Sequence, residues 1–175
     1  VWEDFRNGLY WNLYAQKLDQ SGNFFWKAGG LDLFAGVEES HHNPEIVPDG
    51  YGGLLFVYQK YSQETQGTDI YRCRINSGGD VVFHFATCYA VGEQQNPRIV
   101  KKGSKALLWW EDRRSGNWDI YAQMIRLHDG ILEAARLQMR LEFVEFLDGL
   151  LVAVALTGIR RCECNPAEIA TRVDI

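Results

Sequence analysis

The stretch WEDRRSGNWDIYAQ at residues 110–123 decides the fold, because it returns twice along the chain. Near the N-terminus it reads WEDFRNGLYWNLYAQ at residues 2–16, where seven of the nine positions that can be compared are identical. A degenerate middle copy, YQKYSQETQGTDIY, occupies residues 58–71. Recurrence at a fixed period of 20–50 residues is the mark of a repeat architecture.

The residues upstream of this motif repeat as well. Asn43-Pro44-Glu45-Ile46-Val47 returns as Asn96-Pro97-Arg98-Ile99-Val100, and the two prolines are 53 residues apart. Tyr58 precedes Trp110 by 52 residues, and Tyr71 precedes Tyr121 by 50. The small drift falls in surface turns, which absorb length changes. The repeat therefore has a period of about fifty residues.

Each repeat reads as four short strands separated by turn residues. In the middle copy the strands are expected near residues 45–47, 54–59, 69–75 and 81–87. The second of these is apolar throughout residues 54–58, as is its counterpart at residues 106–110, so both of its faces must be covered. A four-stranded sheet packed between neighbouring sheets is the blade of a β-propeller. A β-sandwich also uses short strands but requires no fifty-residue repeat.

The sequence thus predicts an all-β chain of antiparallel, four-stranded, β-propeller-like blades. Residues 1–40 are expected to form strands two to four of one blade, 41–94 a whole blade, and 95–126 strands one to three of another. Since closed propellers use about four or more blades, further blades are expected outside this chain, which reads as a fragment.

This pattern resembles a known repeat. Trp-Glu-Asp-x-Arg-x-Gly, Asp-Ile-Tyr-Ala-Gln and Gln-x-Asn-Pro-x-Ile-Val are similar to the β-propeller-like repeat of large bacterial secreted and cell-surface proteins, over about 126 residues. Asn12 and Lys60 depart from the pattern, where the other copies have Asp. The resemblance implies export and an extracellular or cell-surface location.

Composition narrows the class of partner. The net charge of -5 argues against nucleic acid, because phosphate binding needs clustered Lys and Arg. No apolar stretch reaches the roughly 20 residues of a membrane span. The four cysteines make no zinc pattern, so no metal site is expected. Cys73 and Cys88 lie on neighbouring predicted strands, where they either form a disulfide or stay as buried thiols.

The repeated acidic pairs admit two interpretations. Glu111 and Asp112 are the carboxylates that a propeller-type glycoside hydrolase or lyase would use. Neighbouring strand residues point to opposite faces, however, and a residue needed once for chemistry has no reason to recur. A structural role is therefore favoured for the repeated positions: Trp2, Asp4, Gly8, Tyr14, Gly67, Asp69, Tyr71, Trp110, Asp112, Gly116, Asp119 and Tyr121.

Ligand binding is expected in the loops. Residues 112–119 are polar enough for calcium, although they match no complete calcium loop and a tight strand connection is favoured. Trp11 and Trp118 stand on the loop side of the motif and are candidates for an exposed aromatic platform, with Arg114 beside them. The predicted function is a non-enzymatic scaffold that binds a glycan or a surface protein.

The tail from residue 127 departs from the repeat. Apolar residues at three- and four-residue spacings predict a helix over about 131–148. Either this helix caps the last blade or the tail is not native coding sequence. Residues 160–175 show no pattern and are expected to form no regular element.

Overall fold

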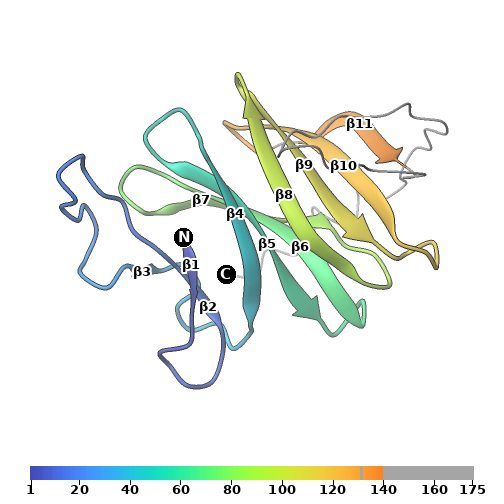
Figure 1. The fold of residues 1–175 in the computed structure, drawn as a ribbon, viewed down its shortest axis with the longest axis horizontal. Helices are drawn as coiled ribbons and strands as arrows, with labels where there is room; N and C mark the ends of the chain where they lie inside the picture. The colour runs from blue at the N-terminus through green and yellow to red at the C-terminus, as the bar shows by residue number, and fades with distance from the viewer. Residues whose placement is uncertain (131, 140–175) are drawn as a thin grey trace, which may run out of the picture.

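The computed structural model describes residues 1–130 and 132–139, which form eleven β-strands and no helix (Figure 1). All strand pairings in these residues are antiparallel. The all-β, antiparallel fold predicted from the sequence is therefore confirmed. None of the described residues lies in a helix that is long and apolar enough to cross a membrane.

The strands form three sheets. The first sheet has the order β1-β2-β3 and contains Trp2–Asp4, Asn12–Ala15 and Leu31–Asp32. The second sheet has the order β4-β5-β6-β7 and contains His41–Pro48, Leu54–Ser62, Gly67–Ile75 and Val81–Cys88. The third sheet has the order β8-β9-β10-β11 and contains Gln94–Lys102, Lys105–Asp112, Asp119–Arg126 and Leu132–Met139.

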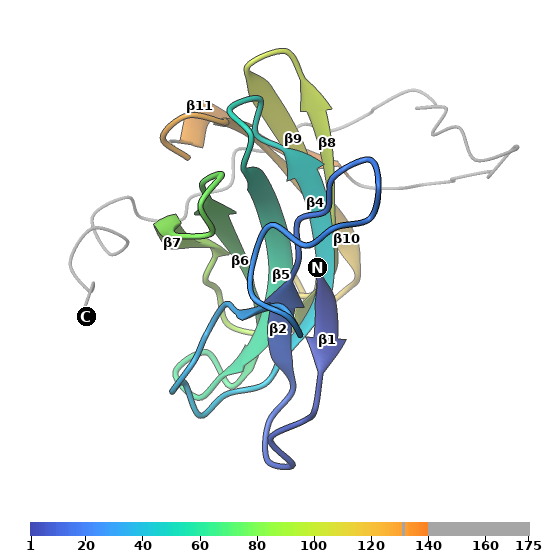
Figure 2. The ribbon, with the colours of Figure 1, turned by 90° about the vertical axis from the view of Figure 1, so that its left-hand side faces the viewer.

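The second sheet lies between the other two (Figure 1). Its first strand, β4, contacts both β1 and β8 (Figure 2). Its strand β5 is buried on both faces: Phe56 and Tyr58 pack with the first sheet, while Leu55 and Val57 pack with the third. Burial on both sides explains why the sequence of β5 is apolar at successive positions.

The three sheets use the same pairing register at the motif. Trp2 pairs with Tyr14, Tyr58 with Tyr71, and Trp110 with Tyr121. Residues that align in the sequence therefore occupy the same position in each sheet. The pairing of directly opposite aromatic side chains stabilises each two-strand ladder.

The C-terminal tail differs from the sequence prediction. Residues 132–139, expected to be helical, form β11 and pair with β10, so that Tyr121 lies opposite Gln138 and Gln123 opposite Arg136. The third sheet thus continues past residue 126 and has four strands. Helix propensity is a weak preference. Without β11, the edge of β10 would expose a row of unpaired N–H and C=O groups, and pairing with these groups outweighs the helix propensity of residues 132–139. The rest of the predicted helix, and residues 149–175, lie outside the described residues.

The two cysteines of the second sheet are buried and form no disulfide with each other. Cys73 belongs to the core cluster that faces the first sheet, whereas Cys88 belongs to the cluster that faces the third. Because the two side chains lie on opposite faces of one sheet, they are not placed to form a disulfide. Of the two alternatives left open by the sequence, the structure has the buried thiols.

Candidate functional site

Three hairpins lie at the same end of the three sheets, and we call this region the hairpin end (Figure 1). It consists of the hairpins 5–11, 63–66 and 113–118, together with the linkers 36–40 and 89–93 that connect the sheets. The main-chain N–H of Arg113 donates to the carbonyl oxygen of Glu93 at 2.9 Å, and that of Trp11 donates to Ser40 Oγ at 3.3 Å. Each linker is therefore bonded to a hairpin.

Asp112 holds the base of the third hairpin in place. Its carboxylate accepts hydrogen bonds from Trp110 Nε1 at 3.0 Å, from the main-chain N–H of Arg114 at 3.0 Å and from Arg114 Nε at 2.9 Å. The Arg114 guanidinium in turn lies 4.3 Å from the centre of the Tyr121 ring. Asp112 is completely buried. Three charge-assisted bonds to one carboxylate fix the turn that follows β9.

The first sheet repeats this arrangement, which we call the Trp-Asp-Arg clasp. Asp4 accepts from Trp2 Nε1 at 3.0 Å, from the main-chain N–H of Arg6 at 3.0 Å and from Arg6 Nε at 2.8 Å. These hydrogen bonds, those of Arg6 foremost, hold the pKa of the Asp4 carboxyl well below its usual range. Arg6 lies 4.1 Å from the Tyr14 ring centre.

Lys60 replaces both the Asp and the Arg of the clasp in the second sheet. Its Nζ lies 4.7 Å from the centre of the Tyr71 ring and pairs with the carboxylate of Glu39. A cation therefore stands over the repeated tyrosine in all three sheets. The change that looked like degeneracy in the sequence preserves this contact.

The two carboxylates of the hydrolase alternative do not share a site. Asp112 faces the core between the second and third sheets, where Cys88 is its neighbour. Glu111 accepts hydrogen bonds from Gln95 Nε2 at 2.9 Å and from Asn96 Nδ2 at 3.0 Å. Successive strand residues point to opposite faces, as the sequence analysis expected. No common site for a substrate bond lies between the two groups.

Sequence reasoning missed a pair of links between the sheets. Asn43 and Asn96, each before a proline, adopt φ of 53° and 54°. The main-chain N–H of Asn43 donates to Glu3 Oε1 in the first sheet at 2.8 Å. That of Asn96 donates to Gln59 Oε1 in the second sheet at 2.9 Å. Asn tolerates the left-handed conformation better than other side chains, so the repeated Asn-Pro pair was the signal for these links.

Trp11 forms an exposed aromatic platform with Phe5. Their ring centres are 5.0 Å apart, and 41% and 43% of the two side chains are exposed. The Trp11 backbone is held on both sides, because its N–H donates to Ser40 Oγ at 3.3 Å and its carbonyl accepts from the N–H of His41. The aromatic surface is thus presented by a fixed backbone.

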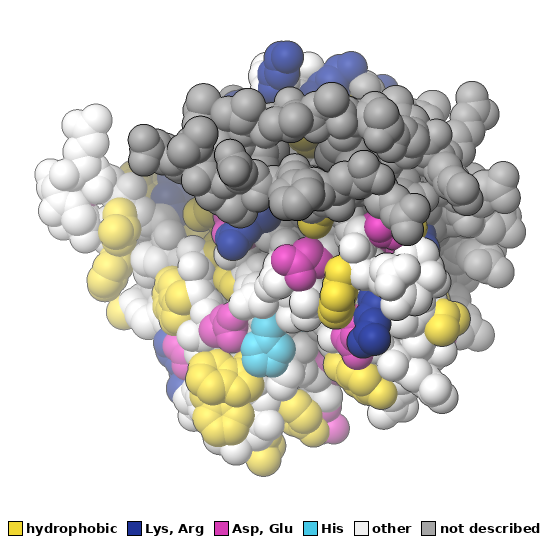
Figure 3. Space-filling view, turned by 45° about the vertical axis from the view of Figure 1, so that its right-hand side comes forward, with side chains coloured by type: hydrophobic (Ala, Val, Ile, Leu, Met, Phe, Trp, Pro, Cys, Tyr) yellow, Lys and Arg dark blue, Asp and Glu magenta, His cyan; other side chains and the backbone are white. Residues whose placement is uncertain are grey.

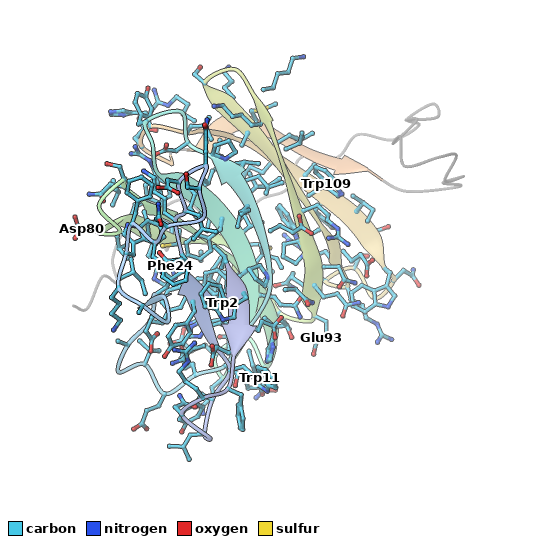
Figure 4. The ribbon with its side chains drawn as sticks, turned by 60° about the vertical axis from the view of Figure 1, so that its left-hand side comes forward. Trp2, Trp11, Phe24, Asp80, Glu93 and Trp109 are labelled. Carbon is cyan, nitrogen blue, oxygen red and sulfur yellow. The ribbon has the colours of Figure 1, made fainter. Side chains whose placement is uncertain are left out.

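Polar groups border this platform. The His42 ring lies 6.3 Å from the Trp11 ring, and its Nδ1 is 2.8 Å from Glu3 Oε2. Figure 4 shows Trp11 below Trp2, where the first hairpin leads into β2. On the surface, hydrophobic, acidic and histidine side chains gather side by side (Figure 3). An apolar surface with polar groups beside it can both stack on a ligand and orient it.

Trp118 occupies the equivalent place in the third hairpin. It is 47% exposed, and the Arg113 guanidinium lies 5.9 Å from its ring centre. Arg114 differs from the expectation that it binds ligand, because its guanidinium is bound to Asp112 and lies over Tyr121. Arg113, and not Arg114, is the arginine beside the exposed ring.

The carboxylates at residues 112–119 are engaged by protein donors. Asp119 Oδ2 accepts from Ser115 Oγ at 2.7 Å, and Asp112 is bound by its clasp. Within residues 1–130 and 132–139 there is no group of three or more His, Cys, Asp or Glu side chains arranged to hold a metal ion. The calcium expectation gains no support from this hairpin.

Asp69 is a buried carboxyl behind the hairpin end. It accepts from Thr65 Oγ1 at 2.8 Å and from the main-chain N–H of Ala90 at 3.4 Å, and it is fully buried. Burial raises its pKa to about 6 despite these hydrogen bonds. Asn12 stands at the equivalent position of the first sheet, where no charge can form.

No protein-family model matches this chain, and neither a curated protein nor a solved structure is significantly similar to it. The candidate site is therefore defined by its own geometry alone.

Proposed function

We propose that this chain is a non-enzymatic, carbohydrate-binding scaffold from an exported, β-propeller-like protein, and that it binds glycans at the hairpin end. The observation that carries the proposal is the pair of exposed tryptophans, Trp11 and Trp118, at equivalent positions of two hairpins. The propeller architecture and the extracellular or cell-surface location rest on the repeat and its resemblance.

Exposed indole rings suit sugars because they offer a flat apolar face to the C–H groups of a pyranose ring. Contiguous exposed aromatic surface, such as Trp11 forms with Phe5, marks a binding site more than a single exposed ring does. Trp11 is also held by backbone hydrogen bonds to the neighbouring linker, so little conformational entropy is lost when a ligand stacks on it.

The neighbours of each ring supply hydroxyl-binding groups. Beside Trp11 these are the paired His42 and Glu3, and beside Trp118 it is the Arg113 guanidinium. Imidazole, carboxylate and guanidinium groups provide both donors and acceptors for sugar hydroxyls. Two platforms on separate sheets favour a polymer over a single sugar, because a polysaccharide engages both and gains avidity.

The test is retention of the full chain on a panel of immobilised polysaccharides, followed by a glycan array. Trp11→Ala and Trp118→Ala are each expected to lower retention at least tenfold on the polysaccharide that binds the unmodified chain. The matched control is Phe24→Ala, which removes a 61% exposed aromatic ring from another loop and should leave retention unchanged (Figure 4).

Failure of the unmodified chain to bind any glycan would overturn the proposal. Equal retention by the chain and both tryptophan variants would also overturn it, since binding would then lie elsewhere. Circular dichroism of each variant separates loss of binding from loss of fold.

A further inference from the structure

One face of the first sheet is exposed, whereas the equivalent face of the third sheet is buried. Both surfaces carry the Trp-Asp-Arg clasp. In the third sheet Trp110 is only 4% exposed, whereas its counterpart Trp2 is 36% exposed. The side chain of Arg114 is 17% exposed, against 47% for Arg6. The same structural device is thus part of an interface in one sheet and open in the other.

In the third sheet, the clasp is covered by side chains of the second sheet. Trp110 and Tyr121 share one core cluster with Leu55 and Val57 of β5, so the clasp face of the third sheet packs on an aliphatic row of the second. The clasp-side residue Tyr58 of the second sheet packs in the same way on Leu13 of the first. In both contacts, the face that carries the repeated Trp or Tyr of one sheet packs on the aliphatic face of the sheet that precedes it.

The aliphatic face of the third sheet corresponds to that of the second. Leu107 and Trp109 align with Leu55 and Val57, and they alternate along β9 with the residues that face the second sheet. Val100 lies directly opposite Leu107 in the ladder and is 47% exposed. Its counterpart Val47 is 8% exposed, because the third sheet covers it.

We propose that the clasp face of the first sheet binds the aliphatic face of the third sheet in a second copy of this chain. The contact joins two different surfaces, so it is head to tail. It repeats the two sheet-to-sheet contacts already present within one copy. This inference does not depend on glycan binding, because it concerns sheet faces and not the hairpin end.

The clasp face is suited to burial. Asp4 and Arg6 neutralise one another, and the Asp32 carboxylate opposite Tyr14 already accepts hydrogen bonds from the Tyr14 hydroxyl at 3.0 Å and from Asn12 Nδ2 at 3.3 Å. The indole N–H of Trp2 is bonded to Asp4, and the ring itself offers a large apolar area. Buried aromatic anchors of this kind carry most of the binding energy at protein interfaces.

The test is the mass of the full chain in solution, by light scattering after size exclusion over a dilution series. The unmodified chain is expected to associate. Trp2→Ala alters the clasp face and Val100→Glu the aliphatic face, and each variant alone is expected to shift association to at least tenfold higher concentration. Phe24→Glu is the control and should leave the mass unchanged.

Mixing the two variants gives the decisive measurement. A head-to-tail contact leaves one intact clasp face and one intact aliphatic face in the mixture, so the Trp2→Ala and Val100→Glu chains should associate with each other better than either does alone. A monomeric unmodified chain, or a mixture no more associated than its components, would overturn the inference. Val100 is half exposed, so its substitution tests the interface without opening the core.

Discussion

Asp69 shows how one side chain can oppose stability at neutral pH. Its carboxyl group is fully buried, and its pKa is raised to about 6 from an ordinary value near 3.8. In the unfolded chain the group loses its proton near pH 4, whereas the folded chain retains it up to about pH 6. The free energy of unfolding therefore falls as the pH rises between these values, and the loss is complete above pH 6.

Asp69→Asn should remove this loss. We expect the variant to be about 3 kcal/mol more stable than the unmodified chain at pH 7 and nearly equal to it at pH 4, since each unit of pKa shift corresponds to about 1.4 kcal/mol. Thr65 can hydrogen-bond to the amide as it does to the acid. Urea unfolding across this pH range is the measurement.

The control for this prediction is Asp80→Asn, an exposed acid-to-amide change that leaves Asp69 in place, so this variant should keep the pH dependence of the unmodified chain. A variant at position 69 that is less stable than the unmodified chain at pH 7 would contradict the prediction. The chain already contains the neutral residue at this position of the first sheet, as Asn12.

At the scale of elements, the linker 89–93 is fixed between two hairpins. A Cβ atom on Gly67 would lie 2.3 Å from the carbonyl oxygen of Gly92, which is closer than any tolerated contact. Arg113 bonds the same linker from the other side. The absence of a side chain at Gly67 is thus what allows the second hairpin to approach the linker.

Gly67→Ala should force the linker outward. We expect a loss of about 2 kcal/mol in the free energy of unfolding, the usual size for overpacking against backbone. Gly78→Ala is the matched control: a Cβ atom there would meet only the side chains of Asn76 and Asp80. Equal stability of the two variants in urea unfolding would show that the linker yields without cost.

Much of the element order was predictable from the sequence, and the reasons are local. The strands β4 to β7 follow from turn residues and apolar runs, and β5 was recognised as buried on both faces because it has no polar alternation. Strand β11 was not predictable in this way. Residues 132–139 have helix-forming composition, and only the edge of β10, which is a tertiary feature, makes them a strand.

The positions of the candidate residues were predictable in part. Trp11 and Trp118 were selected because they lie on the loop side of the motif, and both are exposed, while their role in binding stays a prediction. Two adjacent arginines look alike in a sequence, and only the turn geometry shows that Arg114 reaches back to Asp112 while Arg113 lies beside Trp118. The Asn-Pro links escaped notice because their acceptors, Glu3 and Gln59, lie in another sheet.

At the scale of the whole molecule, the second sheet is shielded on both sides. Cys73 and Cys88 lie on its opposite faces, each within a core cluster. Burial raises the pKa of the Cys73 thiol to about 12, so almost no thiolate exists at neutral pH. Access to either thiol requires that a neighbouring sheet move away.

Thiol labelling should therefore report on separation of the sheets. With a maleimide at pH 7, we expect Cys73 and Cys88 to react at least a hundredfold more slowly in the native chain than in urea, with modified sites identified by mass spectrometry of peptides. Labelling of Cys73 before Cys88 would show that the first sheet separates sooner than the third. Rapid native labelling of both would contradict the packing of the second sheet.

The links made by Asn43 and Asn96 have a consequence for how such a chain can vary. Both links use a main-chain N–H as donor, and the acceptor is a carboxylate in Glu3 but an amide oxygen in Gln59. The main-chain N–H donates to either kind of oxygen with similar geometry: the N···O distance is 2.8 Å to Glu3 and 2.9 Å to Gln59. A Glu-to-Gln or Gln-to-Glu change at either junction therefore changes the surface charge but keeps the hydrogen bond between the sheets. The charge of this surface can vary while the spacing of the sheets stays the same.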